Sequence, residues 1–97
     1  MDSEDTIDVF NPASGEPIAT VAAASEADVN RALESAETAT RTYGALSINE
    51  RKALIDALIE KLKASETEIV DLLILETGKT HEIASYDFNM LVDCFGY

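Results

Sequence analysis

The sequence has no tryptophan, one cysteine, two prolines and four glycines among its 97 residues. Because Cys94 is alone, it cannot form an internal disulfide, and its spacing matches no metal or redox motif, which is compatible with a reducing compartment. The apolar runs are far shorter than the roughly 20 residues that cross a bilayer, so we expect no membrane-spanning segment. The acidic N-terminus, MDSEDTIDV, does not look like a secretory signal, which predicts a cytoplasmic protein.

Basic residues are also scarce: seven stand against 19 acidic residues, which gives a formal net charge of −12. This charge repels nucleic acid and anionic membranes and leaves no basic stripe to bind phosphates, so we expect neither as a partner. The acidity is explained either by a strongly solvated surface or by adaptation to a salt-rich cytoplasm. Hydrophobic residues make up 46% of the chain, an ordinary share for one folded domain or part of one.

The stretch from Ser65 to Thr80, SETEIVDLLILETGKT, is the segment relative to which the others can be placed. Ser65 with Glu68 three residues later predicts a capping box at a helix start, and Gly78 followed by Lys79 predicts the helix end. The body between these signals is apolar on nearly every side. Because such a helix must be covered all round, we expect it to lie in a core.

The chain before this helix begins with an acidic tail, residues 1–8, which we expect to be solvated. Alternating apolar residues then predict two short strands, at about 7–10 and 18–22, joined by a turn that includes Asn11 and Gly15. Two strands alone are marginal in water, so this hairpin must lie against helices or join a larger sheet.

Four helices are expected, at about 25–43, 47–63, 65–77 and 81–95. Ser25 with Asp28 and Ser47 with Glu50 form two further capping boxes. The first helix has an alanine-rich core face that allows close packing. The second has one apolar stripe and keeps its basic residues, Arg51 among them, on the solvent side.

The last of these helices carries two apolar faces. One face comprises Ala84, Phe88, Leu91 and Phe95, and the other comprises Ile83, Tyr86, Met90, Cys94 and Tyr97. Two short strands and three helices cannot cover both faces, so we expect residues 9–97 to form an incomplete domain that lacks its next layer.

Gly78, Lys79 and Thr80 resemble the end of a phosphate-binding loop, but that motif requires a glycine five positions earlier, where Leu73 stands. The motif also follows a strand and opens a helix, whereas here a helix precedes it. We therefore interpret this tripeptide as a helix C-cap.

His81 is the only histidine. No acidic residue stands at the facing i, i+4 position that a helical metal site would use, so we expect a solvated side chain. Cys94 lies about 20 Å further along the same helix, too far for His81 to act as its base. We expect Cys94 to be a buried, small apolar side chain.

The acidic residues of the first helix are Glu26, Asp28, Glu34 and Glu37. An acid and base pair or a site for a hard cation could be built from such carboxylates. Their spacing places them in water, however, where nothing apolar raises a pKa. We therefore expect no catalytic, cofactor-binding or metal-binding residue in the chain.

Four pieces occur in a characteristic order: NPASGEPIATV after a short strand, a serine-capped alanine-rich helix, LSINERKALIDALIEKL, and LLILETGKT. Together they resemble the N-terminal portion of NAD(P)-dependent aldehyde dehydrogenases, from Val9 to Tyr97. Two positions depart from the family pattern, which usually has tryptophan near Tyr43-Gly44 and proline where Thr80 stands.

This resemblance implies an α/β family fold, of which these residues form the mostly helical N-terminal part that packs on the cofactor-binding domain. It implies a homo-oligomeric parent enzyme that oxidises an aldehyde to a carboxylic acid with NAD or NADP, by attack of a cysteine thiolate. The family's catalytic cysteine, general base and cofactor contacts come later in the sequence, and Cys94 does not sit in the catalytic-cysteine motif. The remainder of that chain is thus the implied partner, and the 97 residues alone are expected to be inactive and to bind no cofactor.

Two other functions stay open from the residues alone. The apolar surface of the last helix fits a small acidic helical interaction module without enzymatic activity. The acidic composition fits an ion-binding module, whose stability would depend on added cations.

Overall fold

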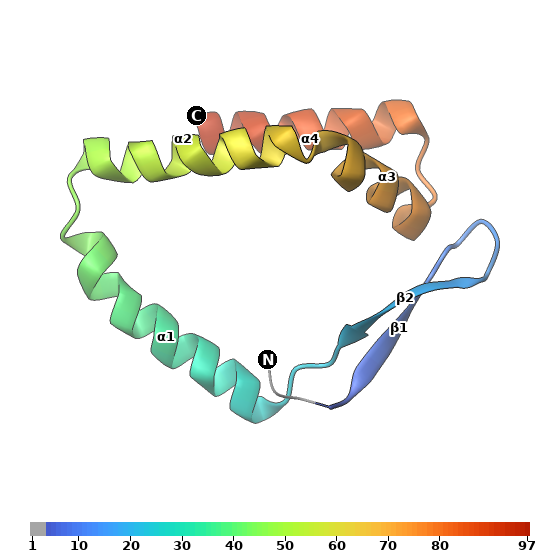
Figure 1. Cartoon of the computed structure of the whole chain (residues 1–97), viewed down its shortest axis with the longest axis horizontal. Coiled ribbons are helices and arrows are strands. Elements are labelled where there is room, and N and C mark those ends of the chain that lie inside the picture. The colour runs from blue at the N-terminus through green and yellow to red at the C-terminus, as the bar shows by residue number, and fades with distance from the viewer. Residues whose placement is uncertain (1–3) are drawn as a thin grey trace.

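The computed structural model describes residues 4–97 as a β-hairpin followed by four helices, which confirms the fold expected from the sequence (Figure 1). The elements are β1 (Thr6–Phe10), β2 (Pro17–Ala22), α1 (Glu26–Gly44), α2 (Ile48–Ala64), α3 (Glu66–Thr77) and α4 (His81–Gly96). No helix within the described range is both long and apolar enough to cross a bilayer.

β1 and β2 pair antiparallel, with Thr6 opposite Ala22 and a shift of register after Val9. The connecting turn is closed by the amide of Gly15, which donates to the carbonyl of Asn11 over 2.7 Å. β1 begins at Thr6, one residue before the strand expected at about 7–10. Asp5 and Asp8 stay exposed, because pairing in a ladder uses backbone groups and tolerates exposed polar side chains. Residues 1–3 lie outside the described part of the chain.

The core of the chain lies between α3 and α4. Val70, Ala84 and Phe88 are buried there, and a few half-buried side chains pack against them. Those supporting side chains are Leu62, Ile69, Leu73, Ile74 and Val92. α2 also packs along α4 and contributes the buried Ile59. This core is small, because it consists of one face of each helix.

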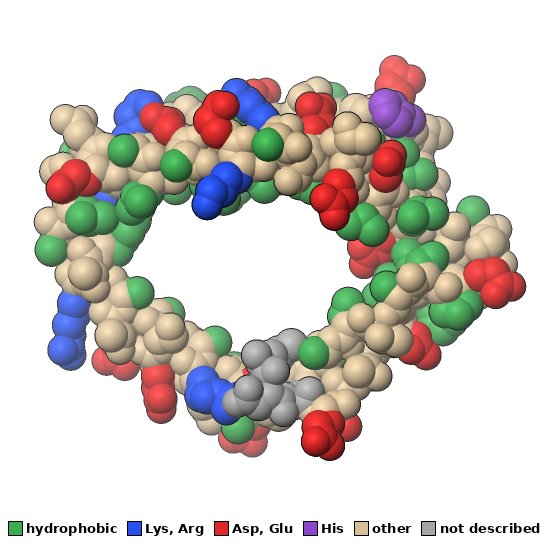
Figure 2. All heavy atoms as spheres, in the orientation of Figure 1, with side chains coloured by type: hydrophobic (Ala, Val, Ile, Leu, Met, Phe, Trp, Pro, Cys, Tyr) green, Lys and Arg blue, Asp and Glu red, His purple; other side chains and the backbone are tan. Residues whose placement is uncertain are grey.

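The elements trace an open ring rather than a filled globule (Figure 1). The radius of gyration is 17.2 Å, whereas a compact domain of this length has about 13 Å. Figure 2 shows the central opening, with hydrophobic side chains along parts of its inner rim. The hairpin closes the ring at the turn between α3 and α4, where Pro12 lies against Gly78.

Two of the three predicted capping boxes are present. Ser25 caps α1 with Asp28, and Ser47 caps α2 with Glu50. The box predicted at Ser65 is wrong: its side chain makes no capping hydrogen bond. Ser65 also ends α2, with its amide bonded to Leu62 O, so its backbone (φ −105°, ψ 12°) is not in the extended conformation of an N-cap.

α3 is covered on one side only. Val70 is buried against α4, but Leu72 and Leu75 on the other side are exposed. The expectation that this helix is covered all round is therefore wrong for residues 4–97, because no described element lies over that second side.

The capping difference predicts the result of a matched pair of substitutions. Ser47→Ala should lower the free energy of unfolding by about 1 kcal/mol, because it removes a cap that is made, whereas Ser65→Ala should change it by much less. Urea unfolding followed by circular dichroism measures both. Equal losses in the two variants would contradict the difference between the two serines.

The small core predicts a second contrast, within α4. Phe88→Ala should destabilise the chain by about 3 kcal/mol, because Phe88 is buried against α3. Tyr86→Ala removes a ring of similar size from an exposed position two residues away and should cost less than about 0.5 kcal/mol. Thermal unfolding of the two variants checks this, and a comparable loss for Tyr86→Ala would show that its face is already packed.

Candidate functional site

Gly78, Lys79 and Thr80 connect two helices. Gly78 is the C-cap of α3 at φ 71°, and its amide donates to Ile74 O over 3.0 Å. The Lys79 ammonium forms an ion pair with Asp87 of α4, and the Thr80 hydroxyl accepts from the amide of Ile83. The three residues thus end one helix and begin the next, as the C-cap interpretation predicts.

His81 is the first residue of α4 and is exposed, as expected, with Nδ1 3.5 Å from the Ser85 hydroxyl. Cys94 lies near the other end of the same helix, about 20 Å away along its axis. It is exposed, so our expectation of a buried cysteine is wrong. The reason is that the side of α4 that carries Cys94 is not covered by any described element.

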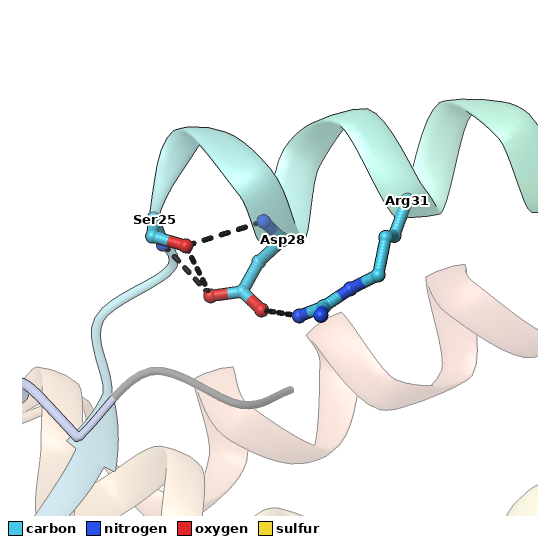
Figure 3. A network of polar contacts seen from close by, with 3 residues as sticks. All are labelled: Ser25, Asp28 and Arg31. Carbon is cyan, nitrogen blue, oxygen red and sulfur yellow. Dashed lines mark hydrogen bonds and ion pairs between the residues drawn. The ribbon is translucent and has the colours of Figure 1, made fainter.

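Of the four acidic residues of α1, three are exposed as expected: Glu26, Glu34 and Glu37. The fourth, Asp28, is buried, which corrects the expectation that all four lie in water. Its carboxylate accepts from the amide and hydroxyl of Ser25, at 2.9 and 2.8 Å, and pairs with Arg31 (Figure 3). The carboxylate of Asp28 thus folds back onto Ser25 at the start of α1, where it completes the capping box.

Arg31 is a partner of Asp28 that the sequence analysis did not identify. Its guanidinium forms an ion pair with the buried carboxylate of Asp28. The signal was available, because residues at i and i+3 are neighbours on a helix surface. This network of Ser25, Asp28 and Arg31 stabilises the start of α1 and leaves no carboxylate oxygen of Asp28 without a hydrogen bond.

The corner between α1 and α2 holds a second group of contacts. The guanidinium of Arg51 lies 5.3 Å from the centre of the Tyr43 ring and donates to Gly44 O over 2.9 Å. Its Nε is buried without a hydrogen-bond partner, so the expectation that Arg51 stays on the solvent side is wrong. The apolar stem and flat head of arginine can cover an aromatic ring, which explains this placement.

Glu50 is beside this corner and fully exposed to solvent. Its carboxylate accepts from the amide of Ser47 over 2.7 Å. That backbone hydrogen bond, together with the one from the Ser47 side chain, lowers the pKa of Glu50 below its ordinary 4.5. Glu50 is thus a capping group.

Among the hollows on the described part of the chain, two open grooves are the larger. One, of about 400 Å³, lies between α2 and the end of α4 and is lined in part by Asp56, Ile59 and Asp93. The other, of about 550 Å³, follows the uncovered side of α3 past Leu72 and Leu75. Within residues 4–97 no three His, Cys, Asp or Glu side chains are grouped closely enough to hold a metal ion.

The sequence model of the aldehyde dehydrogenase family matches residues 1–97. The chain belongs to the aldehyde dehydrogenase family. Among its relatives, malonate-semialdehyde dehydrogenase 2 of Shouchella clausii is 37% identical over 90 residues, which are 93% of this chain and 18% of the relative. The crystal structure of an NAD-dependent benzaldehyde dehydrogenase from Corynebacterium glutamicum superposes with a TM-score of 0.89 at 32% identity, over 97% of this chain and 20% of that one.

The match places the chain in the N-terminal portion of the family fold. The chain spans only about a fifth of the length of the proteins it matches. The contacts described above are helix caps, a helix corner and a small core. They shape the segment and bring no nucleophile next to a base among the described residues.

The lowered pKa of Glu50 predicts how its contribution depends on pH. A carboxylate whose pKa is depressed by folding stabilises the folded state above its unfolded pKa, and this stabilisation is lost as the pH falls through the folded pKa. Glu50→Gln should therefore be less stable than the parent at about pH 7, and the difference should shrink as the pH falls below 4.5 and vanish below the folded pKa, which is lower still. Thermal midpoints across this range measure it, and a difference that does not change with pH would refute the capping charge.

Proposed function

We propose that this chain is the N-terminal part of an NAD(P)-dependent aldehyde dehydrogenase, and that the whole protein oxidises an aldehyde to a carboxylic acid. The family match over the full chain carries the proposal. The superposition on a benzaldehyde dehydrogenase named as NAD-dependent supports a nicotinamide cofactor. Since the two relatives are named for different aldehydes, neither substrate is assigned to this protein.

Within this proposal the 97 residues build the scaffold and perform none of the chemistry. His81 and Cys94 stand too far apart to form a nucleophile with its base, and Lys79 is paired with Asp87. We propose that no residue here is catalytic, binds the cofactor or holds a metal, and that NAD or NADP is bound by the remainder of the enzyme. The proposal includes a cytoplasmic, homo-oligomeric whole enzyme, as the family resemblance implies.

One observation favours a second function, a small acidic interaction module without enzymatic activity. Many large apolar side chains of this short chain are exposed, among them Leu72, Ile83 and Tyr86. Such a surface can dock a partner or a second copy. Light scattering of the purified chain separates the two ideas, because a soluble oligomer of defined size favours the module.

A chimera tests the enzymatic proposal directly. This chain would replace the matching segment of the Corynebacterium glutamicum benzaldehyde dehydrogenase, and oxidation of benzaldehyde would be followed by the reduction of NAD. We expect activity within about tenfold of the parent, a barrier change of about 1.4 kcal/mol, because the segment positions the site without touching reacting atoms.

Two controls accompany the chimera. The host enzyme without any N-terminal segment should be inactive, since its remainder would lose part of its packing. The 97-residue chain alone should give no turnover with NAD or NADP. An inactive chimera that is folded, or turnover by the isolated chain, would overturn the proposal.

A further inference from the structure

Negative charge is distributed unevenly over the helices. Residues 65–97, which form α3, α4 and the turn between them, carry seven carboxylates and one lysine, Lys79. This third of the chain therefore holds half of the net charge of −12. α2 differs, because its three carboxylates stand against four basic side chains. The seven carboxylates belong to Glu66, Glu68, Asp71, Glu76, Glu82, Asp87 and Asp93.

Among the described residues, only one of the seven carboxylates is neutralised by an ion pair. It is the carboxylate of Asp87, and its partner is Lys79. The other six side chains are exposed to solvent. No group of three of them, with or without His81, lies closely enough within residues 4–97 to hold a metal ion. Their charge is therefore left to the mobile ions of the solvent.

α3 carries four of these carboxylates and no basic residue. Glu66 and Asp71 line one small hollow together, and Glu68 and Asp71 line the groove on the uncovered side of the helix. Glu76 lies in the last turn, which has no basic residue. The C-terminal end of a helix carries a partial negative charge that repels a carboxylate. Asp71 and Glu76 are thus placed where a negative charge opposes the helix or its neighbours.

The contact of α3 with α4 must form against this repulsion, and the buried cluster there consists of Val70, Ala84 and Phe88. Packed helices lie about 8–10 Å apart. That separation is within the Debye length of about 10 Å in roughly 0.1 M salt, but well beyond the Debye length of about 3 Å in roughly 1 M salt. Because charge of one sign destabilises a compact state by self-repulsion, added salt should stabilise this contact.

We propose that the packing of α3 on α4 is controlled by ionic strength, so that it is weak in dilute buffer and reaches its full stability in concentrated salt. Of the two explanations of the acidity, this one assigns the protein to a salt-rich solution. The active agent is a monovalent salt that screens the carboxylates without occupying a site. The proposal goes beyond the proposed function, because it concerns the folding of this segment and no step of a reaction.

Thermal unfolding of the 97-residue chain, followed by circular dichroism in about 0.1 M and about 1 M KCl, tests the proposal. A pH of about 8 keeps His81, which lines the same hollow as Glu66 and Asp71, neutral. We expect the thermal midpoint to rise by at least about 5 °C, since a domain of this size shifts by several degrees for a modest gain in stability. An unchanged midpoint, or a chain that stays unfolded in the higher salt, overturns the proposal.

Two variants that each remove two charges separate screening at α3 from the general effect of salt on apolar surface. Asp71→Asn with Glu76→Gln should raise the midpoint in dilute buffer and reduce its rise with salt by at least half. Glu34→Gln with Glu37→Gln removes the same charge from exposed positions of α1 and should leave the rise nearly unchanged. Equal effects of the two variants would show that the charge acts through the whole chain, which contradicts the assignment to α3.

The identity of the cation is the last test. NaCl and KCl should act alike, and about 1 mM MgCl₂ or CaCl₂ should leave the midpoint in dilute buffer unchanged. Stabilisation by a divalent cation at this concentration would show that the carboxylates bind an ion, and would overturn screening as the cause. None of these measurements involves turnover of an aldehyde, so failure of this proposal leaves the proposed function standing.

Discussion

The arrangement of the helices depends on one contact, where Val70 of α3 meets Ala84 and Phe88 of α4. Ala84 is completely buried, so the two helices approach as closely as a methyl group permits. Gly78 makes this return possible, because its φ of 71° is a conformation that side chains disfavour. Pro12 lies so close that a Cβ on Gly78 would stand 3.1 Å from the proline Cγ. Gly78 therefore has two roles: it allows the turn between α3 and α4, and it leaves room for Pro12 of the hairpin loop.

The open shape follows from how few elements share this contact. A domain normally closes two or three layers around one core, whereas here α3 and α4, with α2 alongside, form a single small cluster. α1 contributes one buried residue, Asp28, and that residue serves its own helix cap. The direction of α1 is set at its end, where Arg51 spans Tyr43 and Gly44. The open arrangement is therefore stabilised by contacts where one element turns into the next, and no described side chain fills its centre (Figure 2).

Local signals predicted the elements well because each depends on a few neighbouring residues. The boxes at Ser25 and Ser47 and the C-cap at Gly78 lie where their spacing predicted. The box at Ser65 is not formed because this residue also ends the preceding helix, a conflict that the one-residue gap between the two expected helices already indicated. The errors about Cys94, Asp28 and Arg51 concern burial, which depends on what lies opposite a side chain. Family membership was recognisable because it rests on the order of several motifs, which needs no knowledge of burial.

Several large apolar side chains of α4, among them Ile83, Tyr86 and Met90, are exposed to water, although such side chains are normally buried. Each 100 Å² of apolar surface removed from water contributes about 2.5 kcal/mol. A small domain is stable by only about 5–15 kcal/mol in total, so covering a few hundred Å² of this surface is comparable with its whole stability. The cluster of Val70, Ala84 and Phe88 is the part of the apolar surface that the described elements already cover. Caps and the core contact therefore decide which helices form and how they turn, whereas the exposed apolar residues of α4, such as Ile83 and Met90, contribute little to the stability of residues 4–97.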